Sequence, residues 1–293
     1  MIISDKNKIG AKPKILVHFH LYYHNQLHFV LKKLRNICDC EWNLVVTACE
    51  ISDNIINKIK AFKPDAKIIL VENKGYDIWP FIQVLNETNL SDYDFVLKIH
   101  TKNYRKKFGY FGYGYSWRNF LIDGVLKNKK RFTENLKLLL QNPDIGMIAS
   151  EAVIVPMGYK FSEDNNLFYQ ICSKYNIPAN RGDFVAGTMF IARAECFEPI
   201  KNIKFTQEDF SHEQITDGKQ TVTHVLERLL SRVVEINNYK IYPVPSKKYK
   251  IYKAFKEILK NIFAIRNEVT ETTKRKYICI LGCKYYSREK KLY

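Results

Sequence analysis

The sequence predicts an α/β protein of Rossmann type, in which helices flank a mostly parallel sheet. Three strand-like runs, residues 14–23, 43–47 and 67–71, are separated by two segments with the periodicity of helices. Strands that alternate with helices at this spacing are typical of βαβ units. The chain has 293 residues, 46% of them hydrophobic and 26% charged, which suits a globular protein with one large or two small domains.

The elements of the first half follow in order along the chain. The first strand comes directly after Pro13, and a second helix is expected between Ser52, a residue type that caps helices, and Pro64. A third helix is expected at residues 80–85. The first helix is indicated by apolar residues three and four positions apart, namely Leu27, Val30, Leu31 and Leu34.

The second half continues the alternation. Residues 93–102 are expected to form a buried central strand, and residues 183–193 a turn that leads into another buried strand. The clearest helix is residues 221–233, because its apolar residues form one stripe. Further helices are expected at residues 117–126, 132–140 and 167–175, with a strand at residues 145–149.

Several protein classes are not indicated. No run approaches the roughly 20 apolar residues that span a bilayer, and the first residues lack the layout of a secretion signal. We therefore expect the protein to stay in the cytoplasm. The 7 cysteines are scattered and include no Cys-x-x-Cys pair, so we expect reduced thiols and neither a disulfide framework nor a zinc knuckle.

The charge of the chain is strongly basic and unevenly placed. A formal net charge of +17 indicates an anionic partner such as nucleic acid, a phosphorylated small molecule or a lipid surface. Residues 247–293 contain 14 Lys or Arg against 4 Glu. Within them, residues 253–263 suit either an interfacial amphipathic helix or a helix docked on its own domain. We expect a main domain at residues 1–245 and a basic, helical, amphipathic extension at residues 246–293.

Polar residues follow two of the expected strands, at the edge where open α/β sheets bind ligands. The central strand ends in a His-Thr-Lys sequence, residues 100–102, and Asn73, Gly75 and Asp77 follow the third strand. These residues lie where a nucleotide would bind. A solvated strand end, or a plain turn at residues 73–75, would explain them as well.

Residues 103–115 combine glycines with tyrosines and basic side chains. This composition suits a mobile loop over an anionic, ring-shaped ligand. Stacking on single-stranded nucleic acid is the rival interpretation, and a plain linker is the simplest one.

Acidic side chains near these segments are candidates for a base. Asp183 lies at the mouth of a buried strand, although acids in turns are more often structural. Glu227 lies on the polar side of helix 221–233, within reach of His224 and Arg228. A His-x-x-Glu pair is half of a metal site, but no second nearby His completes it, so zinc is not indicated. An exposed, salt-bridged helix face is the alternative.

Five stretches form an ordered set that covers roughly residues 14 to 240. They are residues 18–23, residues 73–81, residues 97–102, residues 185–190 with Arg193, and residues 217–228, which include Asp217, His224, Glu227 and Arg228. Taken together, these stretches resemble the rhamnan synthesis protein F family, which comprises bacterial glycosyltransferases that help to build cell-wall polysaccharides and O-antigens. Five ordered matches are far more specific than any one of them.

The resemblance implies a GT-A-like fold and a function. Members transfer a sugar, typically L-rhamnose, from a nucleotide diphosphate donor to a lipid-linked glycan, and a related donor sugar such as galactofuranose is the alternative. The basic extension would then contact the anionic inner face of the plasma membrane. A noncatalytic module for RNA or anionic glycans is the alternative from another class, but no RNA-binding signature is present, so nucleic acid is not an expected partner.

The resemblance also implies roles for single residues. GT-A enzymes usually end the central strand in Asp-x-Asp, which holds a metal ion against the donor diphosphate, and a His-Thr-Lys sequence stands in that place here. We therefore expect no metal cofactor, with protein cations neutralising the diphosphate. An inverting transfer needs a base, and the catalytic candidates are Glu227, Asp217, Asp183 and His224. The donor-binding candidates are His18, His20, Asn73, Gly75, Asp77, Lys98, His100, Lys102 and Arg228.

Overall fold

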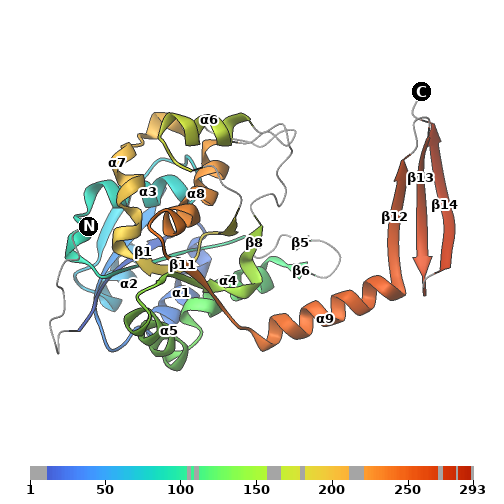
Figure 1. Ribbon diagram of the computed structural model, residues 1–293. Helices are drawn as coiled ribbons and strands as arrows, with labels where there is room; N and C mark the ends of the chain where they lie inside the picture. The colour runs from blue at the N-terminus through green and yellow to red at the C-terminus, as the bar shows by residue number, and fades with distance from the viewer. Residues whose placement is uncertain are drawn as a thin grey trace. The chain divides into compact units, whose positions relative to one another are not determined.

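The computed structural model describes residues 12–103, 107–108, 112–156, 166–178, 182–210, 221–269, 273–281 and 283–291 (Figure 1). Two compact units divide the chain, the first ending at Pro245 and the second beginning at Ser246. The strands of the first unit are β1 (Lys14–His20), β2 (Glu41–Ala48), β3 (Lys67–Leu70), β4 (Phe95–His100), β5 (Lys107–Phe108), β6 (Gly112–Tyr113), β7 (Ile145–Ser150), β8 (Ile154–Pro156), β9 (Asp183–Val185), β10 (Phe190–Arg193) and β11 (Lys240–Val244).

The helices of the first unit are α1 (Leu27–Leu34), α2 (Asp53–Phe62), α3 (Ile78–Glu87), α4 (Gly114–Leu126), α5 (Lys129–Gln141), α6 (Asn166–Lys174), α7 (Glu198–Ile203) and α8 (Val222–Ile236). Short 3-10 helices lie at η1 (His24–Gln26), η2 (Leu90–Asp92), η3 (Glu151–Val153), η4 (Ala194–Phe197) and η5 (Gln207–Asp209).

Seven strands form the central sheet, in the order β11-β7-β10-β4-β1-β2-β3. β1 pairs in parallel with β2 and β4, β2 with β3, and β7 with β11. β10 lies antiparallel between β4 and β7. The sheet is therefore mostly parallel, as the sequence predicts, and the carboxyl ends of β1, β2 and β4 meet at one edge.

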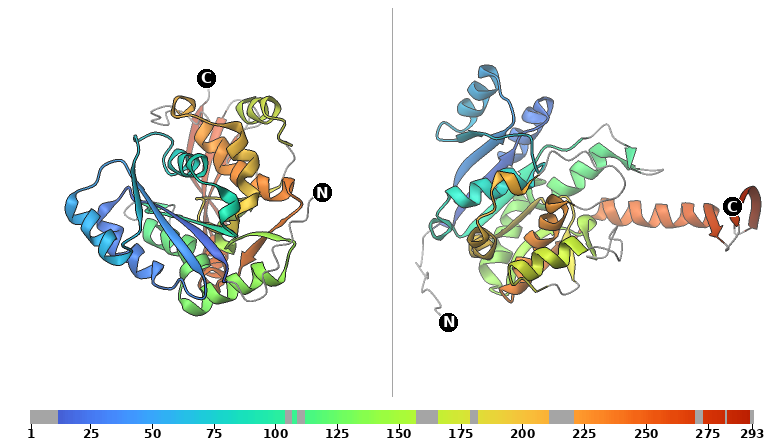
Figure 2. Two further views of the ribbon diagram at one scale, coloured as in Figure 1. Left: turned by 90° about the vertical axis from the view of Figure 1, so that its left-hand side faces the viewer. Right: turned by 90° about the horizontal axis from the view of Figure 1, so that it is seen from above.

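Helices cover both faces of this sheet (Figures 1 and 2). On one face, α3 contacts α7 and α8. On the other, α4 packs on α5 and β7, and Lys33 of α1 forms an ion pair with Asp123 of α4. Every residue of β4 is buried, which is the pattern of a central strand covered on both faces.

A tight turn leads from β3 into α3. Gly75 has a φ of +60° and Tyr76 a φ of +51°. A Cβ atom at Gly75 would lie 2.5 Å from Cδ1 of Phe210, so both the backbone angle and the available space require glycine there. The turn sets Asp77 at the N-cap of α3.

Some boundaries differ from the sequence predictions. The first strand ends at His20 instead of residue 23, and the helix expected at residues 80–85 begins at Ile78. Pro80 fits in the first turn of α3, where its missing N–H has no helical partner. Strand β11 was not predicted, because it contains Pro243, a residue that sheets tolerate at an edge.

The second unit begins with a helix, α9 (Lys247–Ile262), and continues as three strands, β12 (Phe263–Val269), β13 (Thr273–Ile280) and β14 (Cys283–Lys291). These strands form an antiparallel sheet in the order β12-β13-β14. The predicted helical extension is thus helical only as far as Ile262. Tyr277, Ile278 and Ile280 in β13 are residue types that favour strands, which explains why the helix gives way to a sheet. Within the described part of the chain, no helix has both the length and the apolarity to cross a membrane.

Candidate functional site

Side chains from three neighbouring strands gather where the carboxyl ends of β1, β2 and β4 meet. The strand register sets His18 beside Lys98, and it sets His20 between Thr47 and His100. All five side chains are buried. Since residues two apart on a strand point to the same face, they form one cluster on the face that α3 covers.

Lys98 is the centre of this buried cluster. Its Nζ donates to Oδ2 of Asp77 at 2.5 Å, to Oγ1 of Thr188 at 2.7 Å and to the Thr188 carbonyl oxygen at 3.3 Å. The three N–H groups of an ammonium ion therefore have three acceptors within the protein. Burial lowers the pKa of Lys98, and the Asp77 carboxylate opposes this effect.

Asp77 joins the start of α3 to the sheet. Its Oδ2 also accepts a hydrogen bond from Thr188 Oγ1 at 2.6 Å and lies 3.6 Å from His100 Nε2. Burial raises the pKa of Asp77, but His100, Lys98 and Lys102 together outweigh burial and hold that pKa well below its ordinary value. The side chain is 13% exposed, and its carboxylate is ionised at neutral pH.

His18 and His20 share one hydroxyl group. Thr47 Oγ1 lies 2.9 Å from His18 Nε2 and 3.0 Å from His20 Nδ1, and a hydroxyl can donate to one ring and accept from the other. The His18 ring stacks on Phe81, with 5.4 Å between centroids. Burial, followed by the charge of Lys98, lowers the pKa of His18 well below 6.5, and burial lowers the pKa of His20 to about 3.

His100 ties β4 to the turn that precedes β10. Its Nδ1 lies 2.9 Å from the Thr101 carbonyl oxygen, and its Nε2 lies 2.8 Å from the Gly187 carbonyl oxygen. Burial lowers the pKa of His100 to about 4, although Asp77 opposes this shift. A neutral imidazole ring can donate to only one of the two carbonyls. Through these contacts His100 ties the end of β4 to the turn.

The turn between β9 and β10 brings a carboxylate of α8 to the cluster. Gly187 has a φ of +80° and Thr188 a φ of +46°. The Gly187 N–H donates to Glu227 Oε1 at 2.7 Å, and the next residue, Thr188, bonds to Asp77. Adjacent residues of one turn therefore hold two carboxylates, Glu227 and Asp77.

The polar side of α8 packs on β9. Arg228 is 5% exposed, its guanidinium lies 4.7 Å from the Phe184 ring, and its Nη1 donates to the His224 carbonyl oxygen. Ser231 Oγ accepts from the Val185 N–H at 2.9 Å. Burial lowers the pKa of Arg228 to about 10. This side of α8 is not the exposed, salt-bridged surface of the alternative prediction.

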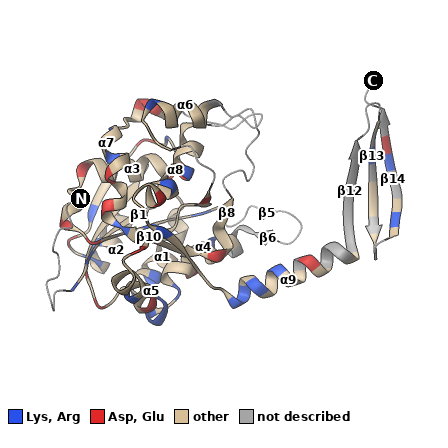
Figure 3. Cartoon of the chain, in the orientation of Figure 1, with Lys and Arg blue, Asp and Glu red and all other residues tan. Residues whose placement is uncertain are grey.

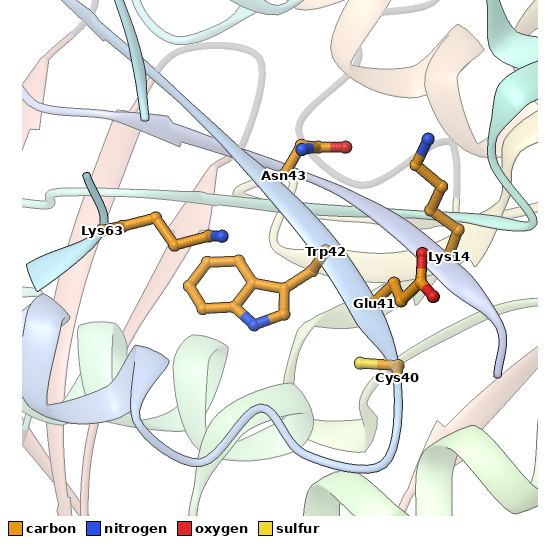
Figure 4. A pocket seen from close by; sticks show the side chains of 6 residues that line it. All are labelled: Lys14, Cys40, Glu41, Trp42, Asn43 and Lys63. Atoms are coloured by element: carbon orange, nitrogen blue, oxygen red, sulfur yellow. The ribbon is translucent and has the colours of Figure 1, made fainter. Parts of the chain in front are cut away.

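A separate pocket opens at the opposite edge of the sheet (Figure 4). It lies at the amino ends of β1 and β2, whereas the buried cluster lies at their carboxyl ends. Ligands of open α/β sheets bind at the carboxyl ends, so we place the candidate site at the cluster. The pocket has a volume of ≈ 470 Å³ and is lined by Lys14, Cys40, Glu41, Trp42, Asn43 and Lys63.

Comparison with known families assigns the first unit. The model of one family, described as rhamnan synthesis protein F, matches residues 1–239. The chain belongs to the rhamnan synthesis protein F family. This confirms the resemblance that the five sequence stretches indicate, and the matched range contains the whole buried cluster with Glu227.

Relatives of this rhamnan synthesis protein F family member include two proteins of Xanthomonas campestris pv. campestris, from strains B100 and ATCC 33913. Both are described as uncharacterized protein WxcX and are 24% identical to it over 240 residues, which are 80% of this chain and 33% of each relative. The chain thus spans about a third of the length of these relatives. A crystal structure of S. aureus TarS 1-349 is similar at a TM-score of 0.40 and 12% identity, covering 85% of this chain and 66% of that chain.

The donor-binding candidates of this family member fall into two groups. Those that converge are His18, His20, Asp77, Lys98 and His100. The others lie around them: Asn73 is exposed in the turn before α3, Gly75 shapes that turn, Lys102 is half-buried with its carbonyl bonded to Gln26, and Arg228 lies against Phe184.

The catalytic candidates also separate. Glu227 reaches the cluster through Gly187. His224 Nδ1 lies 2.8 Å from Thr221 Oγ1 at the start of α8. Asp183 is exposed and pairs with Pro156 where β9 begins. Asp217 and residues 104–106 and 109–111 of the tyrosine-rich loop lie outside the described residues.

Sequence reasoning overlooked two threonines of the buried cluster. Thr47 bonds both His18 and His20, and Thr188 bonds both Asp77 and Lys98. A positional signal existed for Thr47, since it comes near the end of β2 at the same edge as the His-Thr-Lys sequence. Thr188 follows a conspicuous glycine, but nothing local indicates which side chains it meets.

Proposed function

We propose that this chain transfers a sugar, L-rhamnose, from a nucleotide diphosphate donor to a glycan acceptor in cell-surface polysaccharide synthesis. The observation that carries the proposal is the turn at residues 187–188, which holds Glu227 on one side and the Asp77–Lys98 pair on the other. It lies at the carboxyl edge of a mostly parallel sheet, where such folds bind ligands. Membership of the rhamnan synthesis protein F family supports a GT-A-like sugar transferase, with galactofuranose as the second candidate sugar.

Glu227 is the proposed general base of an inverting transfer. The Gly187 N–H binds Oε1, which orients the carboxylate and leaves its second oxygen to accept the proton of the acceptor hydroxyl. Asp77 is a poor candidate for this role, because its pKa is held well below its ordinary value.

Departure of the nucleoside diphosphate builds negative charge that the protein must stabilise. We assign hydrogen bonding of the diphosphate to Lys102, which is half-buried and close enough to lower the pKa of Asp77. Lys98 cannot donate to the diphosphate, because its three N–H groups already bond to Asp77 and Thr188. It acts on the diphosphate only through its positive charge. We propose that no metal ion takes part, since a His-Thr-Lys sequence stands where oxygen ligands are usual.

The proposed acceptor is a lipid-linked glycan, met at the anionic cytoplasmic face of a membrane. The support comes from α9, where Ile251, Phe255, Ile258 and Ile262 recur at the helical period and are all exposed. Lysines occupy other positions of the helix (Figure 3). A helix with an apolar stripe and many lysines suits an anionic interface.

The test is donor turnover by the full chain. A panel of nucleotide sugars that includes dTDP-L-rhamnose and UDP-galactofuranose is incubated with the protein, and released nucleotide is measured. We expect one donor to be turned over, and Glu227→Gln to lower the rate about 10² to 10⁴-fold with little change in nucleotide binding. Glu134→Gln on α5 is the matched control, because this half-exposed carboxylate pairs with Arg131 away from the site.

Two results would redirect the proposal. Near-normal turnover by Glu227→Gln would move the base to Asp183 or Asp217. No binding or turnover across the panel, combined with tight binding of RNA or an anionic glycan, would favour the noncatalytic module.

A further inference from the structure

The Asp77 carboxylate uses its two oxygens differently. Oδ2 accepts hydrogen bonds from Lys98 at 2.5 Å and from Thr188 at 2.6 Å. Among the residues that the structure describes, none donates to Oδ1, and the side chain keeps 13% of its surface exposed. The three donors of Lys98 are therefore used within the cluster, and Oδ1 of Asp77 remains able to accept hydrogen bonds from a ligand.

Asp77 lies close to the place where the transferred sugar must be. The Gly187 N–H binds Glu227, and the side chain of the next residue, Thr188, binds Asp77. Glu227 is also close enough to Lys98, the partner of Asp77, to raise the pKa of Lys98, so the two carboxylates border one small region. A general base marks where the acceptor hydroxyl meets the anomeric carbon, and Asp77 is therefore next to the donor sugar.

We propose that Asp77 selects the donor sugar by accepting hydrogen bonds from its hydroxyl groups. The inference rests on the proposed function, because it takes Glu227 as the base. An ionised carboxylate is a strong acceptor for neutral O–H donors. The diphosphate is not the partner of Asp77, since a carboxylate and a diphosphate at hydrogen-bond distance would repel each other.

Thr188 and Lys98 act as positioning residues for Asp77. Both donate to Oδ2, and Lys98 also donates to both oxygens of Thr188, so the three groups form a closed ring of hydrogen bonds. The φ of +46° at Thr188 is unusual for a β-branched residue. A strained backbone of this kind persists only where the surrounding contacts hold it.

The experiment separates the sugar from the nucleotide. Dissociation constants for dTDP and dTDP-L-rhamnose are measured by calorimetry on the full chain and on four variants: Asp77→Asn, Thr188→Val, Thr188→Ser and Asp53→Asn. Asp77→Asn should weaken the binding of dTDP-L-rhamnose by about 10- to 100-fold and leave the binding of dTDP unchanged.

Thr188→Val keeps the ion pair between Lys98 and Asp77 but removes the hydroxyl that orients Asp77. It should weaken the binding of dTDP-L-rhamnose by about 3- to 10-fold, whereas Thr188→Ser should bind this ligand as the unchanged chain does. Asp53→Asn removes an exposed carboxylate of α2 and should change neither constant.

If Asp77→Asn weakens the binding of dTDP and of dTDP-L-rhamnose equally, the inference is overturned and Asp77 lies against the nucleotide. Unchanged binding of both would overturn it as well. If the panel of nucleotide sugars identifies another donor, that donor and its free nucleoside diphosphate are used in place of dTDP-L-rhamnose and dTDP. A wild-type chain that binds no nucleotide sugar counts against the proposed function itself. Thermal unfolding without ligand checks folding, and Thr188→Val decides the matter if Asp77→Asn is unfolded.

Discussion

Lys98 Nζ lies 2.5 Å from Asp77 Oδ2, and the lysine side chain is fully buried. The pair joins the centre of the sheet to the first turn of α3. Removing one partner of a buried ion pair leaves the other charge uncompensated. Lys98→Met should therefore lower the free energy of unfolding by about 3 to 5 kcal/mol, measured by urea denaturation.

The double variant Lys98→Met with Asp77→Asn should recover part of this loss, because it removes the uncompensated carboxylate charge. Lys67→Met is the control, since Lys67 pairs with Glu87 on the surface and is 58% exposed. That substitution should change stability by less than about 1 kcal/mol. Equal effects of the buried and exposed lysine substitutions would contradict the account of the cluster.

Acid should destabilise the protein between about pH 6.5 and pH 3. The buried cluster holds three histidines, and the folded pKa of His20 is about 3 and of His100 about 4, against 6.5 for an unperturbed ring. Below pH 6.5 the unfolded chain binds more protons than the folded chain, so the free energy of unfolding decreases as the pH is lowered. At pH 5, His20 alone accounts for about 2 kcal/mol of this loss, visible as a falling urea midpoint.

His20→Asn should flatten this pH dependence, although the variant is less stable at pH 7 because Thr47 loses a partner. His28→Asn provides the comparison, since His28 is exposed on α1. A urea midpoint that stays constant from pH 7 to pH 5 would show that the cluster is not a neutral, buried set of rings.

Donor binding should survive removal of divalent metal ions. The His-Thr-Lys sequence stands where carboxylate ligands are usual, and the part of the chain that the structure describes holds no group of three His, Cys, Asp or Glu side chains suited to a metal ion. Turnover of the identified donor is measured in excess EDTA and then with added Mg²⁺ or Mn²⁺. Loss of turnover in EDTA with rescue by either ion would refute the prediction.

The stripe on α9 should bind anionic vesicles. Phe255 and Ile258 are 54% and 55% exposed, and lysines near an anionic surface each add about 1 kcal/mol of attraction. Replacing both apolar residues by Asn should weaken sedimentation with phosphatidylglycerol vesicles, and phosphatidylcholine vesicles should bind poorly from the start.

Leu140→Asn is the matched control for this experiment, because Leu140 is 55% exposed on α5 in the first unit. Nucleotide binding should be the same in all three proteins. If the double variant sediments as well as the unchanged chain, the stripe has another partner, and a change in oligomeric state on dilution would identify a second copy of the chain.

The sequence predicts most of the first unit because its signals are local. Apolar periodicity locates α1, α5 and α8, and the polar ends of buried strands indicate the edge of the sheet where the buried cluster lies. The contacts that build the site are not local: Lys98 meets Thr188 across 90 positions, and Gly187 meets Glu227 across 40. No pattern within a short window encodes such pairings, so Thr188 was overlooked as a partner of Asp77.

The strands of the second unit were missed for a different reason. Residues 263–291 contain so many Lys and Arg residues that the alternation of apolar and polar residues typical of a strand is hard to recognise. The apolar stripe of α9 was visible beforehand, because a helix repeats its pattern within about four residues.

The antiparallel placement of β10 has a kinetic consequence. β4 ends at the edge of the sheet where the buried cluster lies, whereas β10 begins there. The turn at residues 187–188 therefore reaches this edge only when β10 pairs between β4 and β7. Pairings between segments so far apart in sequence form slowly. During refolding from denaturant, helical signal should return before the chain regains affinity for a nucleotide sugar, because we expect that affinity to require β10 in its place between β4 and β7.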